Sequence, residues 1–176
     1  MKARITLAEV AYVTAAAFVV AAIIRPFVLE NQFQGRINAS LLKLRRLHDA
    51  LILYTEDAGG ISYTDPSKSL PPSAYVYTTF LGLDRSDFVS DCGYNPLINP
   101  NFEKLTVSYT FDGSDVAVNY FQKRREKAFL FTDGSCNRDA RLWTSVVAKK
   151  RGLGVTVDGN AVIRYKAGNA DSLDWW

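Results

Sequence analysis

The longest apolar segment of the chain lies near its N-terminus and runs from Leu7 to Ile24. Glu9 is the one charged residue within it. Counted from Ile5, the segment has 20 residues, and at about 1.5 Å per residue a helix of that length spans roughly 30 Å, the thickness of a bilayer core. The pattern therefore predicts a hydrophobic helix over residues 5–29 that is able to cross a membrane.

A helical period of apolar positions continues over residues 30–58. Residues of one face recur there at steps of three and four: Leu41, Leu44, Leu47 or His48, Leu51 and Tyr54. Charged residues lie between them, which is typical of an amphipathic helix. Gly59-Gly60 predicts the end of the helix, because glycine adopts the left-handed C-terminal conformation without strain. Pro26 removes an interior hydrogen bond and predicts a bend near the membrane exit. We expect one long helix, hydrophobic in its first half and amphipathic in its second.

After residue 104 the apolar residues alternate with polar ones, which is typical of strands. The expected strands lie at 107–111, 116–120, 128–131, 153–157 and 161–165. Asp112-Gly113, Asp133-Gly134 and Asp158-Gly159 supply turn signals between or after them. We expect an antiparallel sheet within residues 105–170, with one face covering the apolar stripe of the helix.

Residues 59–104 show neither period. Five of the six prolines lie there, with many Ser, Asn and Asp neighbours, which predicts loops. Only the run 75–83 is apolar enough to pack as a short helix or strand. The patterns together predict an α+β protein with a short basic leader at residues 1–4, the hydrophobic helix at 5–29, its amphipathic continuation at 30–58 and one globular head at 59–176.

The apolar segment has two plain interpretations, a cleaved secretory signal and a single-span membrane anchor. A cleaved secretory signal has an apolar region of about 7–15 residues before a small-residue site, whereas this segment is longer and ends in Arg25-Pro26-Phe27. A simple single-span anchor, with Glu9 near the lipid headgroups, stays open because apolar length specifies only spanning. Lys2 and Arg4 predict a cytoplasmic N-terminus and an exported head.

Glu9 is the costly residue of the apolar segment. A carboxylate at mid-membrane costs about 2.5–3.5 kcal/mol, and somewhat less near a helix end. We therefore expect a positive group on a neighbouring chain to offset this cost.

Residues 5–26, ITLAEVAYVTAAAFVVAAIIRP, resemble the N-terminus of type IV prepilins and type II secretion pseudopilins. Ile5 to Glu9 matches the family's Phe-Thr-Leu-Ile-Glu-like start, and Pro26 stands at its helix-bending proline. Residues 44–57 are similar to a helix end found in pseudopilin-like proteins with large C-terminal domains. Arg4 replaces the glycine that precedes the family's cleavage site.

The resemblance implies a structural subunit of a type IV pilus or a secretion pseudopilus. In that family the acid compensates the N-terminal amine of the next subunit, a role that falls to Glu9. If the leader stays, Arg4, Lys2 or the amine of Met1 would be the positive partner. The implied processing position lies between Arg4 and Ile5. The implied subunit contacts are Ile5, Leu7, Glu9, Val10, Val13, Phe18, Pro26 and Phe27.

The implied partners are further copies in a helical filament, the inner-membrane assembly machinery and, before assembly, the lipid bilayer. The implied location is the inner membrane, with the N-terminus in the cytoplasm, followed by a filament at the cell surface. Some pseudopilins hold calcium in their C-terminal loops, which draws attention to Asp112, Asp115, Asp133 and Asp158. Since Asp-Gly also serves hairpin turns for conformational reasons, we expect turns and no metal.

Two cysteines, Cys92 and Cys136, lie in loops of the expected head. An oxidising compartment favours a disulfide, which stabilises by about 2–4 kcal/mol, and two unpaired buried thiols are the alternative. His48 is the one histidine and is expected to pack on a helix flank. No nucleophile elbow, zinc-protease motif, phosphate-binding loop or dinucleotide fingerprint is present in the sequence, so we expect neither an enzyme nor a cofactor.

A net charge of +3 is too small and too scattered to indicate nucleic-acid binding. The basic clusters 123–125 and 149–151 are expected to be solvated turns. Trp175-Trp176 is either a subunit contact or tucked into the head. We expect a filament subunit, and the alternative is a monomeric membrane-tethered binding module that presents loops 59–104.

Overall fold

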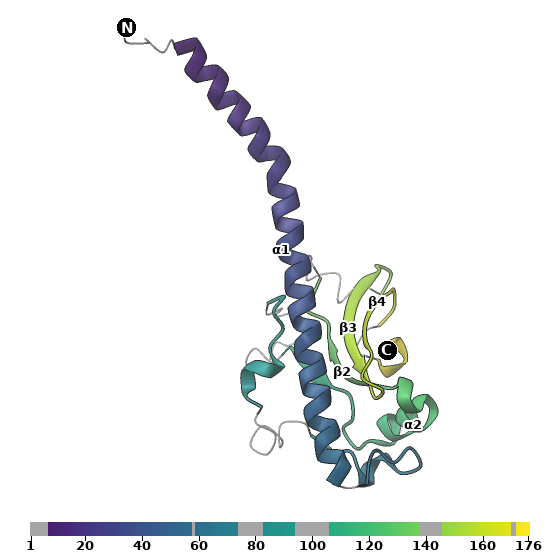
Figure 1. The fold of residues 1–176 in the computed structure, drawn as a ribbon. Helices are drawn as coiled ribbons and strands as arrows, with labels where there is room; N and C mark the ends of the chain where they lie inside the picture. Colours follow the sequence, from purple (N-terminus) through teal and green to yellow (C-terminus); the bar gives the residue numbers. More distant parts are fainter. Residues whose placement is uncertain (1–6, 58, 74–82, 94–105, 138–145, 170–171) are drawn as a thin grey trace. The chain divides into compact units, whose positions relative to one another are not determined.

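The structure of the protein, a computed structural model, describes residues 7–57, 59–73, 83–93, 106–137, 146–169 and 172–176, apart from the side chain of Glu9 (Figure 1). The chain divides into two compact units, residues 1–36 and 37–176. Helix α1 (Leu7–Asp57) begins in the first unit and ends in the second. Its 51 residues confirm the long helix that the apolar periods predict.

The end of α1 is formed by the predicted glycine pair. Gly59 and Gly60 adopt φ values of +84° and +87°. The Gly60 N–H donates to the Thr55 carbonyl at 2.8 Å, and the Gly59 N–H donates to the Glu56 carbonyl at 3.0 Å. These two bonds form a Schellman motif, which satisfies carbonyls that the helix end would leave unpaired.

The second part of α1 buries one face in the head. The buried positions recur at steps of three and four: Ile37, Ser40, Leu44, Leu47, Leu51 and Thr55. Leu41 is half-buried and Tyr54 is 38% exposed, so these two predicted stripe residues lie at its edges. The stripe packs against the sheet, which confirms the α+β class.

The sheet has four antiparallel strands in the order β1-β2-β3-β4. They are β1 (Val107–Tyr109), β2 (Phe129–Asp133), β3 (Lys150–Thr156) and β4 (Ala161–Lys166). Val107 pairs with Asp133 across β1 and β2, Asp133 pairs with Leu153 across β2 and β3, and Leu153 pairs with Ile163 across β3 and β4. Asp158-Gly159 forms the β3–β4 turn as predicted, with Gly159 at φ +80°.

The strand predicted at 116–120 is wrong, because helix α2 (Asp115–Arg124) occupies this position. The Ser114 hydroxyl accepts the Ala117 N–H at 3.3 Å and caps the helix. Ala117, Tyr120 and Phe121 are buried, at steps of three and four, whereas Val116 is 69% exposed. Burying these three residues on one face of a helix stabilises this segment more than the alternating pattern of a strand would.

Outside the two α-helices and the sheet, the described remainder of the chain is mostly irregular. In the predicted loop region it contains the 3₁₀ turns η1 (Pro66–Lys68) and η3 (Arg85–Phe88). Another 3₁₀ turn, η4 (Arg125–Lys127), follows α2. The apolar run predicted to pack at 75–83 lies outside the described residues except for Leu83, which is buried.

The C-terminus folds back onto the head. Turn η5 (Leu173–Trp175) places Trp175 and Trp176 against Phe129, and both tryptophans are buried. The Arg164 guanidinium donates to the carbonyls of Trp175 and Trp176. Of the two interpretations of the Trp-Trp terminus, the structure supports the one in which the pair tucks into the head.

Candidate subunit interface and the polar sites of the head

The first part of α1 exposes its large apolar side chains on every side. Among the predicted contact residues, Leu7 is 90% exposed, Val10 54%, Val13 66%, Phe18 74% and Phe27 69%. Other large apolar side chains on this stretch are exposed as well: Tyr12, Val19, Val20, Ile23, Ile24, Val28 and Leu29. A helix that is apolar all round needs lipid or other protein around it.

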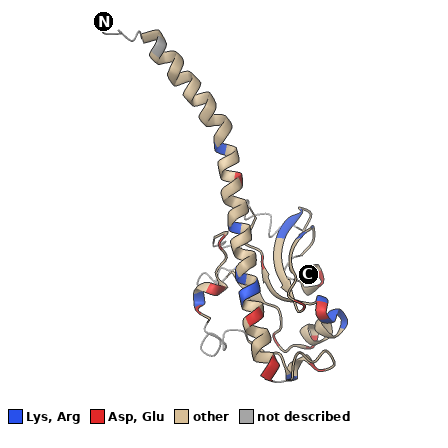
Figure 2. Ribbon diagram, in the orientation of Figure 1, with Lys and Arg blue, Asp and Glu red and all other residues tan. Residues whose placement is uncertain are grey.

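This apolar stretch of α1 contains few polar or charged side chains. Figure 2 shows no Lys or Arg on α1 before Arg25. The Thr14 hydroxyl donates back to the Val10 carbonyl, so that its polar atom is satisfied within the helix. Among the described residues, α1 is the one helix long and apolar enough to cross a membrane, and the most apolar part of it has no residue buried inside the chain.

The charged and processing residues of the prediction are only partly described. The backbone of Glu9 lies in the first turns of α1, and its side chain is outside the described structure. Arg4 and Ile5 are outside it as well. Pro26 lies inside α1 with an exposed side chain, and the helix continues beyond it. The roles of Glu9, Arg4 and Ile5 stay predictions.

Cys92 and Cys136 form a disulfide, with their Cα atoms 5.0 Å apart. This confirms the pairing and excludes the alternative of two unpaired thiols. The Ser40 hydroxyl of α1 lies 4.0 Å from Cys92 Sγ and 3.9 Å from Cys136 Sγ. The bond therefore ties the irregular region before β1 to the segment after β2, directly beside the buried face of α1.

A buried polar cluster surrounds this disulfide. Asp133, the last residue of β2, is fully buried, and its Oδ1 accepts the Ser135 N–H at 2.8 Å. Its Oδ2 lies 3.9 Å from Cys136 Sγ. The Ser40 and Ser90 hydroxyls are 3.2 Å apart within the same cluster. A carboxyl group, hydroxyls and two sulfurs thus share a site from which solvent is largely excluded.

Burial raises the pKa of the Asp133 carboxyl above its ordinary value of 3.8, and the Asp91 carboxylate raises it further. Hydrogen bonds from Ser90 and Ser135 oppose the rise without cancelling it. Asp91 itself accepts from Lys43 at 2.9 Å. Asp133 therefore holds its proton to a higher pH than an exposed aspartate does.

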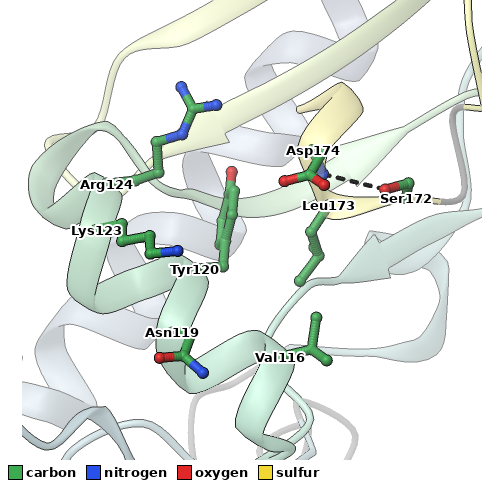
Figure 3. Close-up of a pocket in the computed structure, with 8 residues that line it drawn as sticks. All are labelled: Val116, Asn119, Tyr120, Lys123, Arg124, Ser172, Leu173 and Asp174. Atoms are coloured by element: carbon green, nitrogen blue, oxygen red, sulfur yellow. Dashed lines mark hydrogen bonds between the residues drawn. The ribbon is translucent and has the colours of Figure 1, made fainter.

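A second feature of the head is an open groove of about 470 Å³ between α2 and the C-terminal turn η5. Its lining residues are Val116, Asn119, Tyr120, Lys123, Arg124, Ser172, Leu173 and Asp174. Figure 3 shows Tyr120 between the basic residues of α2 and Asp174, with Val116 and Leu173 at the apolar end. The Tyr120 hydroxyl accepts the Phe129 N–H at 3.1 Å, and burial raises the pKa of Tyr120.

His48 packs on the helix flank, as predicted. Its Nε2 lies 2.9 Å from the Val157 carbonyl oxygen, and its Nδ1 lies 2.9 Å from Asp49 Oδ1. An atom added at Gly159 would lie 3.1 Å from the imidazole Cε1. The imidazole therefore fits closely under the β3–β4 turn, where it joins α1 to the sheet.

Two of the four predicted carboxylate positions serve local structure. Asp112 accepts from Ser114 before α2, and Asp158 accepts from Thr156 and Asn160 within the β3–β4 turn. These hydrogen bonds lower the pKa of both carboxyls, most through the Ser114 and Thr156 hydroxyls, respectively. Over the described ranges, no three His, Cys, Asp or Glu side chains gather as a metal site would require.

One of the predicted solvated basic residues is buried. Lys150 begins β3 and is 1% exposed, so a solvated turn is wrong for this position. The strand carries its side chain to a covered face of the sheet. Lys123 and Arg124 are exposed as expected, but they lie at the end of α2.

Sequence reasoning missed two features of the head. It treated Asp133 as part of a turn, although its spacing of three residues from Cys136 was a signal for proximity. It missed the groove because one wall is α2, which was predicted to be a strand. The other wall is the folded-back C-terminus, and no local pattern predicts where that segment packs.

Comparison with known proteins adds no family to this picture. The chain has no significant match among protein-family models, curated proteins or solved structures.

Proposed function

We propose that this protein is a structural subunit of a type IV pilus-like or secretion pseudopilus filament that assembles through the first part of α1. The observation that carries this proposal is the uncovered apolar surface between Leu7 and Leu29. The same helix continues into a head with its own core and buries Leu44 and Leu47 there. Because the head covers only the second part of the helix, the first part requires lipid or other copies of the chain.

Before assembly, the first part of α1 would anchor the chain in the inner membrane. Its length and composition suit a single span. Lys2 and Arg4 favour a cytoplasmic N-terminus, which would place the head outside the cytoplasm. The Cys92–Cys136 disulfide supports an exported head, since disulfides persist in oxidising compartments. The role is structural and involves no catalysis.

In the proposed assembly, Glu9 of one copy meets a positive group at the N-terminus of the next. A carboxylate in an apolar bundle is costly unless it is paired. If residues 1–4 are removed, the partner is the new amine at Ile5. If they stay, Arg4, Lys2 or the Met1 amine takes that place. N-terminal sequencing of protein from the membrane and from sheared surface material distinguishes these two cases.

The test of the proposal is Glu9→Ala in cells that make the protein. We expect filaments in the sheared surface fraction to fall by at least about tenfold, because the unpaired positive end of each neighbour stays buried. The membrane fraction should keep the protein, with its disulfide formed. Glu56→Ala is the matched control, since Glu56 is an exposed residue at the far end of the same helix.

A monomeric tethered binding module is the second candidate. The groove beside α2 favours it, although this groove lies outside the loops 59–104 that the sequence indicated. Under that function, Glu9→Ala improves membrane insertion and changes nothing else. Cross-linking of the wild-type protein in membranes separates the two. Products joined through Phe18 or Val13 support the subunit, whereas exclusively monomeric protein with Glu9 at the headgroups contradicts it.

A further inference from the structure

The two cysteines of the disulfide differ in their exposure to solvent. Cys136 is fully buried, whereas Cys92 is half-buried in the irregular region before β1. A reagent or an oxidoreductase that exchanges thiols with this pair therefore reaches Cys92 first. Cys136 then has to react from within the folded head, and its proton has to move where little water is present.

Two hydroxyls and one carboxyl of the described residues lie near Cys136 Sγ. Ser90 Oγ lies 3.8 Å away, Ser40 Oγ 3.9 Å and Asp133 Oδ2 3.9 Å. Hydroxyls are poor proton acceptors near neutral pH, but a carboxylate is an effective one. The other oxygen of Asp133 is held by the Ser135 N–H at 2.8 Å, which fixes the carboxyl group beside the sulfur.

We propose that Asp133 is the proton acceptor and donor of Cys136 in thiol–disulfide exchange at the Cys92–Cys136 pair. This inference does not depend on filament assembly, because every group in it belongs to the second compact unit, residues 37–176.

Disulfide formation follows in two steps, with a low-molecular-weight or protein disulfide as the oxidant. The Cys92 thiolate attacks one sulfur of the oxidant, forms a mixed disulfide and releases the first oxidant thiolate. Cys136 then transfers its proton to the Asp133 carboxylate, and its thiolate attacks Cys92 Sγ. The second oxidant thiolate leaves, so that two electrons pass to the oxidant and Asp133 returns the proton to solvent.

Reduction reverses these steps. A thiolate reductant attacks Cys92 Sγ, the bond to Cys136 breaks, and Cys136 leaves as a thiolate inside the head. Protonated Asp133 donates its proton to that sulfur, and a second reductant thiolate attacks the reductant sulfur of the mixed disulfide and releases Cys92 as a thiolate. Burial raises the pKa of the Asp133 carboxyl from its ordinary value toward that of a thiol, which makes proton transfer between the two groups less unfavourable in both directions.

The charged groups that face Asp133 are few in the part of the chain that the structure describes. The Asp91 carboxylate acts on it from the loop before β1 and raises its pKa. Lys43 of α1 bonds to Asp91 at 2.9 Å and partly offsets that charge. Asp91 is thus a neighbouring carboxylate of equal charge, which makes it a suitable control position.

The experiment uses the full chain in detergent micelles. The protein is reduced with dithiothreitol, checked by circular dichroism for an unchanged fold, and reoxidised with oxidised glutathione between pH 5 and 8. Samples are trapped with an alkylating reagent and weighed by mass spectrometry. In Asp133→Asn we expect closure of the mixed disulfide to slow by about 10- to 100-fold at pH 7, so that the glutathionylated intermediate accumulates.

Two further variants separate proton transfer from a general effect of charge. Asp91→Asn removes a nearby carboxylate that does not have to take the proton, and we expect closure within about threefold of wild type. Asp133→Glu keeps a carboxyl group and should restore part of the rate. Equal rates in Asp133→Asn and wild type at every pH would overturn the proposal, as would equal slowing in both asparagine variants.

If Asp133→Asn does not keep the fold after reduction, the wild-type pH profile decides. With Asp133 as the base, the closure rate levels off between the pKa of the carboxyl group and the ordinary thiol pKa of about 8.5. A rate that climbs about tenfold per pH unit up to that value shows a thiol that ionises without help, and this result contradicts the proposal.

Discussion

The two parts of α1 carry their apolar side chains toward different surroundings. Between residues 7 and 29 the large apolar side chains are exposed, from Val28 at 45% to Leu7 at 90%. Between residues 37 and 51 the core positions Leu44 and Leu47 are fully buried. One continuous helix therefore contains a segment that the chain covers by itself and a segment that it leaves uncovered.

The two parts of α1 also differ in their charged residues. Val10 to Ile24 contains no charged residue, whereas the second part of the helix is tied to the head by ion pairs. Arg46 lies 3.1 Å from Asp87, and Lys43 lies 2.9 Å from Asp91. A one-sided apolar stripe with polar flanks indicates packing on a sheet, and an apolar surface all round indicates lipid or neighbouring helices. The comparison therefore assigns the folding of the head to the second part of the helix and leaves the first part available for lipid or for the proposed assembly.

The strongest test of this division is a pair of leucines in the second part of α1. Leu47→Ala creates a cavity in the core and should lower the free energy of unfolding of the head by about 2–5 kcal/mol. Leu42→Ala, at a residue that is 64% exposed, should change it by less than about 0.5 kcal/mol. Urea unfolding of the full chain in detergent, followed by circular dichroism, measures both.

The same measurement on Phe18→Ala extends the test to the uncovered part. Phe18 is 74% exposed, so the head should unfold as in the wild type while assembly weakens. A large loss of head stability in this variant would show that the two parts are not independent, and the division would fail.

A second pair of variants compares glycines in the two regions. In β3, a methyl group at Gly152 would lie 2.7 Å from Trp175 Cζ3, so that Gly152→Ala forces the tryptophan pair to move. We expect a loss of about 1–3 kcal/mol. Gly35 in α1 has no atom within 4 Å of the added methyl group, and Gly35→Ala should stabilise the helix there by up to about 1 kcal/mol.

Unfolding of the head measures the effect of Gly152→Ala, and amide hydrogen exchange around residue 35 measures that of Gly35→Ala. Opposite signs are the expected result. If Gly35→Ala destabilises its region, some group packs closely against the helix there in the assembled or membrane-bound state.

Much of this fold could be predicted because its signals are local. A largely apolar segment of 20 residues, a glycine pair after the amphipathic segment and an Asp-Gly turn between alternating strands each require only neighbouring residues. Helix α2 could not be predicted in this way. Val116, Val118 and Tyr120 alternate, while Ala117, Tyr120 and Phe121 follow the helical period, so that both patterns occur within residues 116–121 and share Tyr120. Only packing in the core decides between the two.

The sites likewise contain features that could be predicted from the sequence and features that could not. The disulfide could be predicted because the chain has two cysteines and an expected exported head. The proximity of Ser40 to Cys136 could not, because these residues are separated by 96 positions and are brought together by packing of α1 on the head. The buried tryptophan pair and the groove beside α2 likewise depend on where the C-terminal segment docks.

The smallest expected effect lies in the β3–β4 turn and depends on pH. The Thr156 hydroxyl and the Asn160 amide hold the pKa of Asp158 below its ordinary value of 3.8. A carboxyl group with a lowered folded-state pKa contributes stability at pH values above its unfolded-state pKa, and this stability is lost as the pH falls through the folded-state pKa.

Asp158→Asn keeps a residue that suits the turn before Gly159 but removes the charge. At pH 7 we expect it to cost less than about 1 kcal/mol, since the group is exposed. The difference from wild type should shrink as the pH falls below 3.8. Urea unfolding at pH 7, 4 and 2.5 measures this difference, and a constant gap at all three values would show that the turn depends on the hydrogen-bonding pattern of the aspartate side chain and not on its charge.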